Sequence, residues 1–250
     1  MAWGMDMSAK IDLPYYAGVP VAIDGRGWLL VIASVIVAFF QLILAPFDTV
    51  PLIFVPAVVF MGLPLLTLMA VTGWRPPAIF RPLDLKQFGI GIGFGVLTVI
   101  VSGIAGFAVA TLYGASPNAA VAGLASYGPV DLLLFLARTF VQLIGEEAVS
   151  ILPLLAVLWL CVSKFGLSRR AGLVIAVVVS TLWFSAMHLP TYDWNVVQCL
   201  GIIGTARIIL TLAYLATRNL WVSSIAHIVN DWTLFLTSFA LGHLPVGVEG

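Results

Sequence analysis

Long apolar runs, separated by short segments rich in proline, glycine and charge, dominate the chain. A helix needs about 20 predominantly apolar residues to cross the hydrocarbon core of a bilayer. Runs near this length predict seven spans, at about 28–45, 51–72, 88–112, 131–163, 171–188, 196–216 and 220–240. The runs are continuous, whereas the strands of a membrane β-barrel alternate between apolar and polar residues. The pattern predicts an all-α, polytopic transmembrane helical bundle of about seven spans.

The composition supports this prediction. Hydrophobic residues make up 62% of the chain and charged residues only 9%, against about 25% charged in a typical soluble domain. Most of the surface must therefore face lipid. The formal net charge of zero argues against a nucleic-acid partner recognised through bulk charge.

Basic residues are confined to alternate segments between the predicted spans. Of eleven Lys and Arg residues, two lie inside spans, and the other nine lie in the N-terminal tail and every second loop: Lys10, Arg26, Arg75, Arg81, Lys86, Lys164, Arg169, Arg170 and Arg218. Because cytoplasmic loops are enriched in Lys and Arg, we expect a cytoplasmic N-terminus and a C-terminus outside. No internal repeat or linker is visible, so the predicted organisation is a tail at 1–27 and a single transmembrane domain at 28–250.

Ionisable residues within the spans are unevenly distributed. Residues 28–112 hold none inside a span, whereas the last four spans contain Arg138, Glu146, Glu147, His188, Arg207, His227 and Asp231. Each such group costs roughly 2.5–3.5 kcal/mol at the centre of a spanning helix and is by default a functional suspect. We therefore expect the spans within 28–112 to be scaffold and the later spans to hold a site.

Helical spacing groups these residues into faces. His227 and Asp231 are four residues apart, as are Phe184 and His188, so each pair shares a helix face. Adjacent residues such as Glu146 and Glu147 point about 100° apart. One of the two carboxylates can face a cavity while the other requires a different partner.

Two hydrolytic chemistries fit a buried carboxylate, two histidines and an Asp or Asn. A glutamate can take a proton from water while histidine and amide donors stabilise the oxyanion of a tetrahedral intermediate. Alternatively, two histidines and a carboxylate can hold zinc and leave a position for water. The spacing does not choose between them.

The three motifs resemble those of the CPBP intramembrane proteases, a family that includes the CAAX prenyl endopeptidases and bacterial proteins linked to peptide maturation or bacteriocin self-protection. The family carries EExxxR, FxxxH and HxxxN/D in that order. The chain has Glu146-Glu147, then Phe184 to His188, then His227 to Asp231, and the resemblance covers about residues 130–235.

The chain departs from the family pattern at two positions. Ile151 stands where the first motif has Arg, and the third motif ends in Asp231, which cannot donate to an oxyanion when ionised. Asn230, one residue earlier, is a substitute donor. We hypothesise that Arg207, on a neighbouring span, supplies the positive charge that is missing at Ile151.

The resemblance implies a metal-free peptidase in which Glu146 activates the water and His188 assists. His227 and Asp231 would hold the oxyanion or the water, and Glu147 would play a supporting role. The expected substrate is a membrane-associated peptide or protein, prenylated or not. Two alternatives stay open: a degenerate relative that only binds a peptide or partner, as an immunity protein would, and a proton-coupled transporter.

The expected depths of these residues in the membrane argue against a single site that contains all of them. Counted at about 1.5 Å per residue from the basic side, His227 lies at roughly 10 Å and Asp231 at roughly 16 Å, but His188 and Glu146 lie at roughly 25 Å. The run 131–163 is also too long for one straight crossing, so we expect a break in it or a protruding end.

Overall fold

The computed structural model describes residues 12–45, 47, 49–118, 121 and 123–243, and the regular structure within them is entirely helical. The long helices are α1 (Gly25–Leu44), α2 (Val55–Val71), α3 (Leu85–Tyr113), α4 (Pro129–Trp159), α5 (Arg169–Met187), α7 (Gly204–Thr217) and α8 (Leu220–Gly242). The short ones are η1 (Leu52–Phe54), η2 (Leu124–Ser126), η3 (Leu160–Lys164), η4 (Pro190–Tyr192), α6 (Val196–Gln198) and η5 (Cys199–Ile203). The predicted all-α class is confirmed.

When the short helical turns that continue α2, α4 and α7 are counted with them, the predicted spans correspond to the observed helical segments with bounds within three residues. Six helical segments of the described chain are long and apolar enough to cross a membrane: Gly25–Leu44, Leu52–Val71, Leu85–Tyr113, Pro129–Lys164, Arg169–Met187 and Val196–Thr217. The seventh predicted span forms α8, which is not among the six. Its polar residues, including His227, Asn230 and Asp231, lower its hydropathy. The chain is an integral, multi-pass membrane protein.

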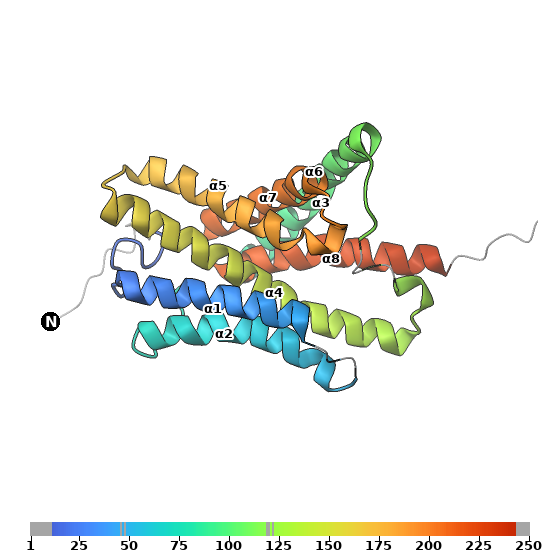
Figure 1. Cartoon of the computed structure of the whole chain (residues 1–250), viewed down its shortest axis with the longest axis horizontal. Helices are drawn as coiled ribbons and strands as arrows, with labels where there is room; N and C mark the ends of the chain where they lie inside the picture. The colour runs from blue at the N-terminus through green and yellow to red at the C-terminus, as the bar shows by residue number, and fades with distance from the viewer. Residues whose placement is uncertain (1–11, 46, 48, 119–120, 122, 244–250) are drawn as a thin grey trace, which may run out of the picture.

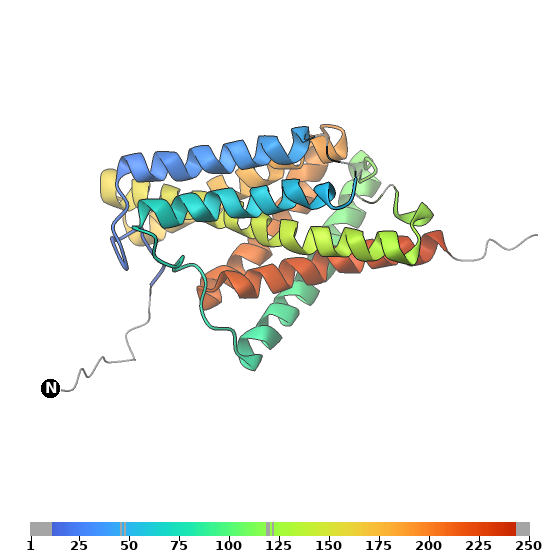
Figure 2. The same ribbon diagram turned by 90° about the horizontal axis from the view of Figure 1, so that it is seen from below.

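Most of the long helices run along the long axis of the molecule, with α4 between α1 and α2 on one side and α5 on the other (Figure 1). Helix α3 crosses this direction steeply (Figure 2) and packs mainly on α8 and α7. Helix α1 begins at the end opposite to the one where α8 terminates (Figure 1). The turn after α2 and the turn between α4 and α5 lie at the end where α1 begins. The sidedness of the two termini in the membrane stays a prediction.

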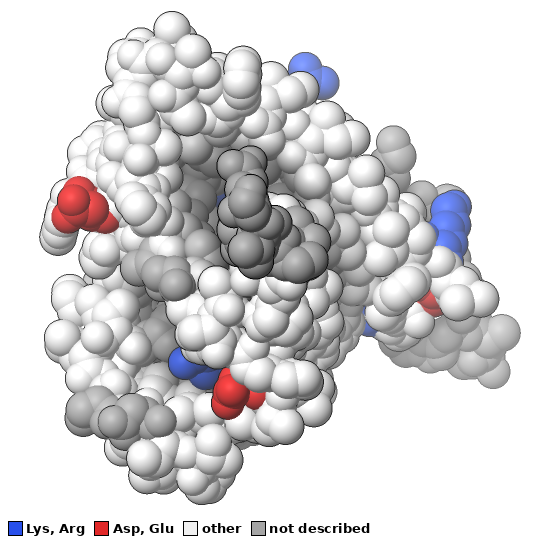
Figure 3. All heavy atoms as spheres, turned by 90° about the vertical axis from the view of Figure 1, so that its right-hand side faces the viewer, with Lys and Arg blue, Asp and Glu red and all other residues white. Residues whose placement is uncertain are grey.

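Large apolar side chains are exposed on the outer surface. Leu85 is 91% exposed and Phe107 is 77% exposed, both on α3. Viewed from the end where α8 terminates, the surface is hollowed and carries few charged side chains (Figure 3). Contiguous exposed apolar surface of this kind marks contact with a membrane or a partner.

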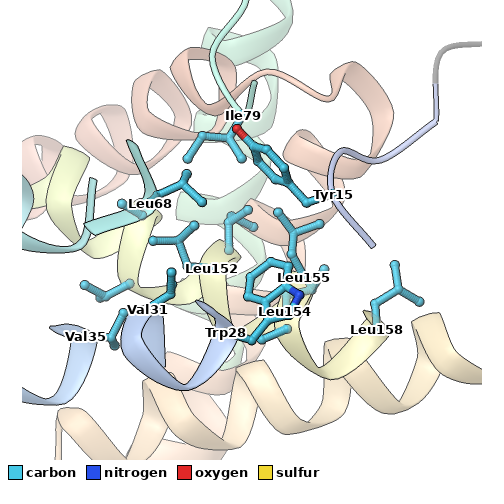
Figure 4. Close-up of a cluster of buried hydrophobic side chains, with 14 of the residues drawn as sticks. Tyr15, Trp28, Val31, Val35, Leu68, Ile79, Leu152, Leu154, Leu155 and Leu158 are labelled. Carbon is cyan, nitrogen blue, oxygen red and sulfur yellow. The ribbon is translucent and has the colours of Figure 1, made fainter. Parts of the chain in front are cut away.

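The apolar core lies between α1, α2 and the second half of α4 (Figure 4). Val31, Leu68, Leu152 and Leu155 are fully buried there. The N-terminal segment closes one side of it through Tyr15, whose hydroxyl accepts a hydrogen bond from the backbone N–H of Ala78 at 2.7 Å. Part of the predicted tail therefore packs into the core, while residues 1–11 of that tail lie outside the described residues.

Two glycines set the contact between α3 and α8. A Cβ at Gly91 would lie 2.8 Å from a methyl of Ile225, and a Cβ at Gly95 would lie 2.6 Å from Cβ of Val229 and 2.9 Å from the carbonyl oxygen of Ala226. Small residues at this spacing let two helix backbones approach closely. This close approach fixes α8 at the level of His227.

The neighbouring glycines behave differently. A Cβ at Gly89 or Gly93 would meet no atom within 4 Å. Of the glycines at 89–95, Gly91 and Gly95 therefore serve helix packing, whereas Gly89 and Gly93 face open space.

Candidate active site

The two adjacent glutamates of α4 lie at the centre of the fold. Glu146 borders a cavity of about 440 Å³ formed by α3, α4, α5, α7 and α8. It also borders a second cavity of about 350 Å³ on the side of α1 and α2. Both cavities are lined by Arg138, Gln142, Glu146, His188 and Thr191. A substrate in either cavity would reach the same carboxylate.

Two imidazoles converge on one oxygen of Glu146. Oε2 lies 3.8 Å from Nε2 of His188 and 3.7 Å from Nε2 of His227. The other oxygen, Oε1, accepts a hydrogen bond of 3.0 Å from the amide of Gln142, one turn earlier on α4. The carboxylate is thus oriented by Gln142, with one oxygen directed at both histidines.

His188 is held at the end of α5 in a defined orientation. Pro190, two residues later, lacks an amide hydrogen and prevents the helix from continuing. Nδ1 of His188 lies 2.9 Å from the carbonyl oxygen of Phe184. Because a carbonyl can only accept, Nδ1 carries the hydrogen, and in the neutral ring Nε2 presents a lone pair toward Glu146.

Phe184 explains the aromatic position of the second motif. Its ring centroid lies 4.5 Å from that of His188 and 6.0 Å from that of His227. On the same ring, the guanidinium carbon of Arg207 lies 5.1 Å from the centroid. One side chain therefore packs against both histidines and against the buried cation.

Glu147 turns away from the cavity and pairs with Arg207. The guanidinium donates two hydrogen bonds to the carboxylate, Nη1 to Oε1 at 2.7 Å and Nη2 to Oε2 at 2.9 Å. Both side chains are fully buried, and Nε of Arg207 also donates to Thr211 at 3.2 Å. The divergence of the adjacent glutamates is confirmed. Arg207 lies beside Glu147, and the hypothesis that it replaces the Arg missing at Ile151 stays a prediction.

His227 is surrounded by carboxylates. Its Nδ1 lies 2.9 Å from Oε1 of Glu147, close in distance although not aligned as a hydrogen bond. Nε2 lies 3.6 Å from Oδ1 of Asp231, which in turn accepts a hydrogen bond of 2.9 Å from the amide of Asn230. Asp231 and Asn230 both line the larger cavity.

The structure brings all eight predicted site residues together, so the expected mismatch in depth is wrong. Its cause is the position of the turn between α7 and α8. Asn219 in that turn is fully buried and bonded to the backbone of Arg81 and the side chain of Gln87. Because α8 therefore begins well inside the fold, His227 lies deeper than a count from the loop implies.

Of the two alternatives expected for the fourth span, a break or a protruding end, the break is absent. Helix α4 is continuous through Pro153 to Trp159 and extends through the π-turn η3. The 36-residue segment is about 54 Å long, against about 30 Å of hydrocarbon, so it protrudes or tilts.

Sequence reasoning missed two polar residues of the site. Gln142 stands four residues before Glu146, and this spacing was the available signal. Tyr192 lines the larger cavity from η4, and its hydroxyl accepts a hydrogen bond of 3.0 Å from Asn118. Burial raises the pKa of Tyr192 above its usual value, with the negative charge of Asp231 adding to the effect.

The histidines and carboxylates of the site are residue types that bind zinc. Within the described part of the chain, no group of three or more His, Cys, Asp or Glu side chains is arranged to hold a metal ion. The expectation of a metal-free reaction stays a prediction.

The comparison with protein families places the site in a known group. Residues 128–233 match the family described as type II CAAX prenyl endopeptidase Rce1-like. The chain contains an Rce1-like domain. This match confirms the resemblance to the CPBP family, and the Rce1-like domain includes every residue of the candidate site. No curated protein and no solved structure matches the chain.

Proposed function

We propose that the chain is an intramembrane endopeptidase in which Glu146 activates a water molecule against a peptide bond of a membrane-associated, CAAX-type protein. The single observation that carries this proposal is the convergence of two histidine Nε2 atoms, at 3.7 and 3.8 Å, on one oxygen of Glu146. A water molecule placed among these three atoms could bond to each of them at about 2.8 Å. The cavities on both sides of Glu146 give a peptide access to that water.

The proposed reaction begins with the water held between Glu146 and His188. One proton of the water is transferred to the carboxylate of Glu146. The remaining O–H donates a hydrogen bond to the lone pair on Nε2 of His188. The hydroxide adds to the carbonyl carbon, and the carbonyl electron pair moves to the oxygen. The oxyanion electron pair then re-forms the C=O bond as the C–N bond breaks, and Glu146 gives its proton to the leaving nitrogen, which returns the carboxylate to its starting state.

The oxyanion needs a donor, and His227 is the best placed candidate. A protonated His227 can donate from Nε2, and the carboxylates of Glu147 and Asp231 offset its charge. In this proposal Asp231 orients His227 instead of bonding the oxyanion, which accounts for an acid at the last motif position. The amide of Asn230 is the second candidate donor.

The proposal is tested by comparing new peptide N-termini in membranes of cells expressing wild type, Glu146→Gln or Asp131→Asn at matched abundance. Asp131 is an exposed acid on the same helix, so its variant controls for loss of a carboxylate. Termini that appear with wild type and Asp131→Asn but not with Glu146→Gln support the proposal. Identical termini in all three would indicate a non-catalytic binding protein.

Metal dependence has a separate test. We expect purified protein to keep its activity after treatment with a zinc chelator, because Glu146 and the histidines supply the base and the donors. Loss of activity on chelation, restored by added zinc, would show the zinc mechanism instead.

A further inference from the structure

Arg138 lies on the same face of α4 as the proposed base. It is eight residues before Glu146, with Gln142 midway between them, and these residues line both cavities. Helical periodicity at this spacing places the three side chains in one row. The row carries a cation at one end and the base at the other.

No anion of the described residues pairs with Arg138. Its nearest described interaction is with the ring of Phe135, 5.5 Å from the guanidinium carbon, and its buried Nε has no hydrogen-bond partner. The ion pairs of the described chain involve other cations. Asp131, about two turns earlier on α4, accepts a hydrogen bond from the backbone N–H of Gly128.

The contrast with Arg207 shows what is missing at Arg138. Arg207 binds both oxygens of a carboxylate, Glu147, in the geometry that a guanidinium favours. An unpaired cation inside a membrane-spanning helix is costly and marks a binding or transport role. The guanidinium of Arg138 can thus form a bidentate pair with a carboxylate that comes from outside the chain.

The surrounding cavity indicates where that carboxylate comes from. The smaller cavity is lined on its far side by apolar side chains, including Phe39, Leu42, Ile43, Ile53, Phe60 and Met187. It suits apolar residues of a peptide that carries its negative charge at the chain end. We propose that Arg138 anchors the free C-terminal carboxylate of the substrate, an inference that rests on the proposed peptidase function.

Binding tests the anchor independently of cleavage. Two fluorescein-labelled decapeptides ending in Ala-Leu-Val-Leu, one with a free C-terminal carboxylate and one with a C-terminal amide, are titrated into Glu146→Gln protein in detergent. We expect at least tenfold tighter binding of the carboxylate peptide. In Glu146→Gln proteins that also carry Arg138→Gln, both peptides should bind with the affinity of the amide form, and Arg138→Lys should keep part of the preference.

Two results would contradict the proposal that Arg138 anchors the carboxylate. Equal binding of the two peptides to Glu146→Gln protein, or a preference that survives Arg138→Gln, overturns it. Unchanged affinity for the amide peptide shows that Arg138→Gln leaves the fold intact. Because these proteins lack the proposed base, failure of the peptidase proposal would show instead as absent cleavage by wild type.

Discussion

The two halves of α4 lie in opposite surroundings. In the first half, Arg138, Gln142 and Glu146 border two cavities. In the second half, Leu152 and Leu155 are fully buried among apolar residues of α1, α2 and the N-terminal segment (Figure 4). One continuous helix therefore joins a polar site to an apolar anchor.

The difference lies in what each half requires of its residues. An apolar interior tolerates exchanges that conserve volume, because dispersion contacts do not depend on a particular atom. In the polar half the carboxylates of Glu146 and Glu147 each depend on particular partners, so removing one partner leaves a buried group uncompensated. Substitutions in the first half should change activity, and those in the second half should change stability alone.

The largest effect is expected for Arg207→Leu. This change leaves the carboxylate of Glu147 buried without its bidentate partner, and losing one member of a buried pair costs about 3–5 kcal/mol. We expect a markedly lower Tm in detergent and loss of peptidase activity, because Glu147 also contacts His227. Thermal unfolding and the N-terminus assay measure the two effects.

A double variant separates the charge from the packing. Arg207→Leu combined with Glu147→Leu removes both charges, and stability should recover by several kcal/mol relative to Arg207→Leu alone. Activity should not recover, since His227 has lost its neighbour. An Arg207→Leu protein that folds normally and keeps full activity would show that the pair is dispensable.

A smaller effect, confined to stability, is expected for Leu155→Ala. In a bilayer the unfolded helices also sit in hydrocarbon, so the transfer term of a core truncation is largely lost and the cavity term remains, about 2 kcal/mol. Activity per folded molecule should match wild type, and Leu155→Met should be close to neutral. A specific loss of activity in folded Leu155→Ala protein would contradict the division of α4 into two halves.

The sequence was sufficient to predict the helices because each span is a continuous apolar run bounded by proline, glycine or charge. It could not give their relative depth. The offset of α8 comes from hydrogen bonds between Asn219 and residues 81–87, more than 130 positions away. A count of residues from a loop assumes that each turn lies at the membrane surface, and this turn is buried.

For the site, spacing indicated which residues share a face, and the divergence of Glu146 and Glu147 followed from 100° per residue alone. The side chain that pairs with each carboxylate depends on how the helices pack in the tertiary structure. Arg207 was expected as a replacement for the cation missing at Ile151, since it was one of two arginines inside spans. For Gln142, the one local signal that it would orient the carboxylate of Glu146 was its position four residues earlier on the same helix.

The smallest effect is expected for a pair of the same chemistry placed outside the bundle. Arg169 donates from Nε to Oδ2 of Asp12 at 2.9 Å, with side chains 40% and 42% exposed. Partial burial raises the pKa of Asp12, but hydrogen bonds from Arg169 and Tyr16 outweigh it and lower the pKa to about 2. Solvent limits such an exposed pair to about 0–1 kcal/mol, against about 3–5 kcal/mol for the buried pair.

The lowered pKa fixes the sign of the pH dependence. Because the folded state favours the ionised carboxylate, the pair stabilises the fold above the unfolded pKa of about 4 and loses this effect as the pH falls toward 2. Unfolding of wild type, Asp12→Asn, Arg169→Gln and the double variant should give a coupling energy below about 1 kcal/mol at pH 7, vanishing near pH 2. A coupling as large as that of Arg207 and Glu147 would mean that burial does not separate the two pairs. A small coupling would show that the site, with its cation sealed from solvent, is where this fold depends on charge.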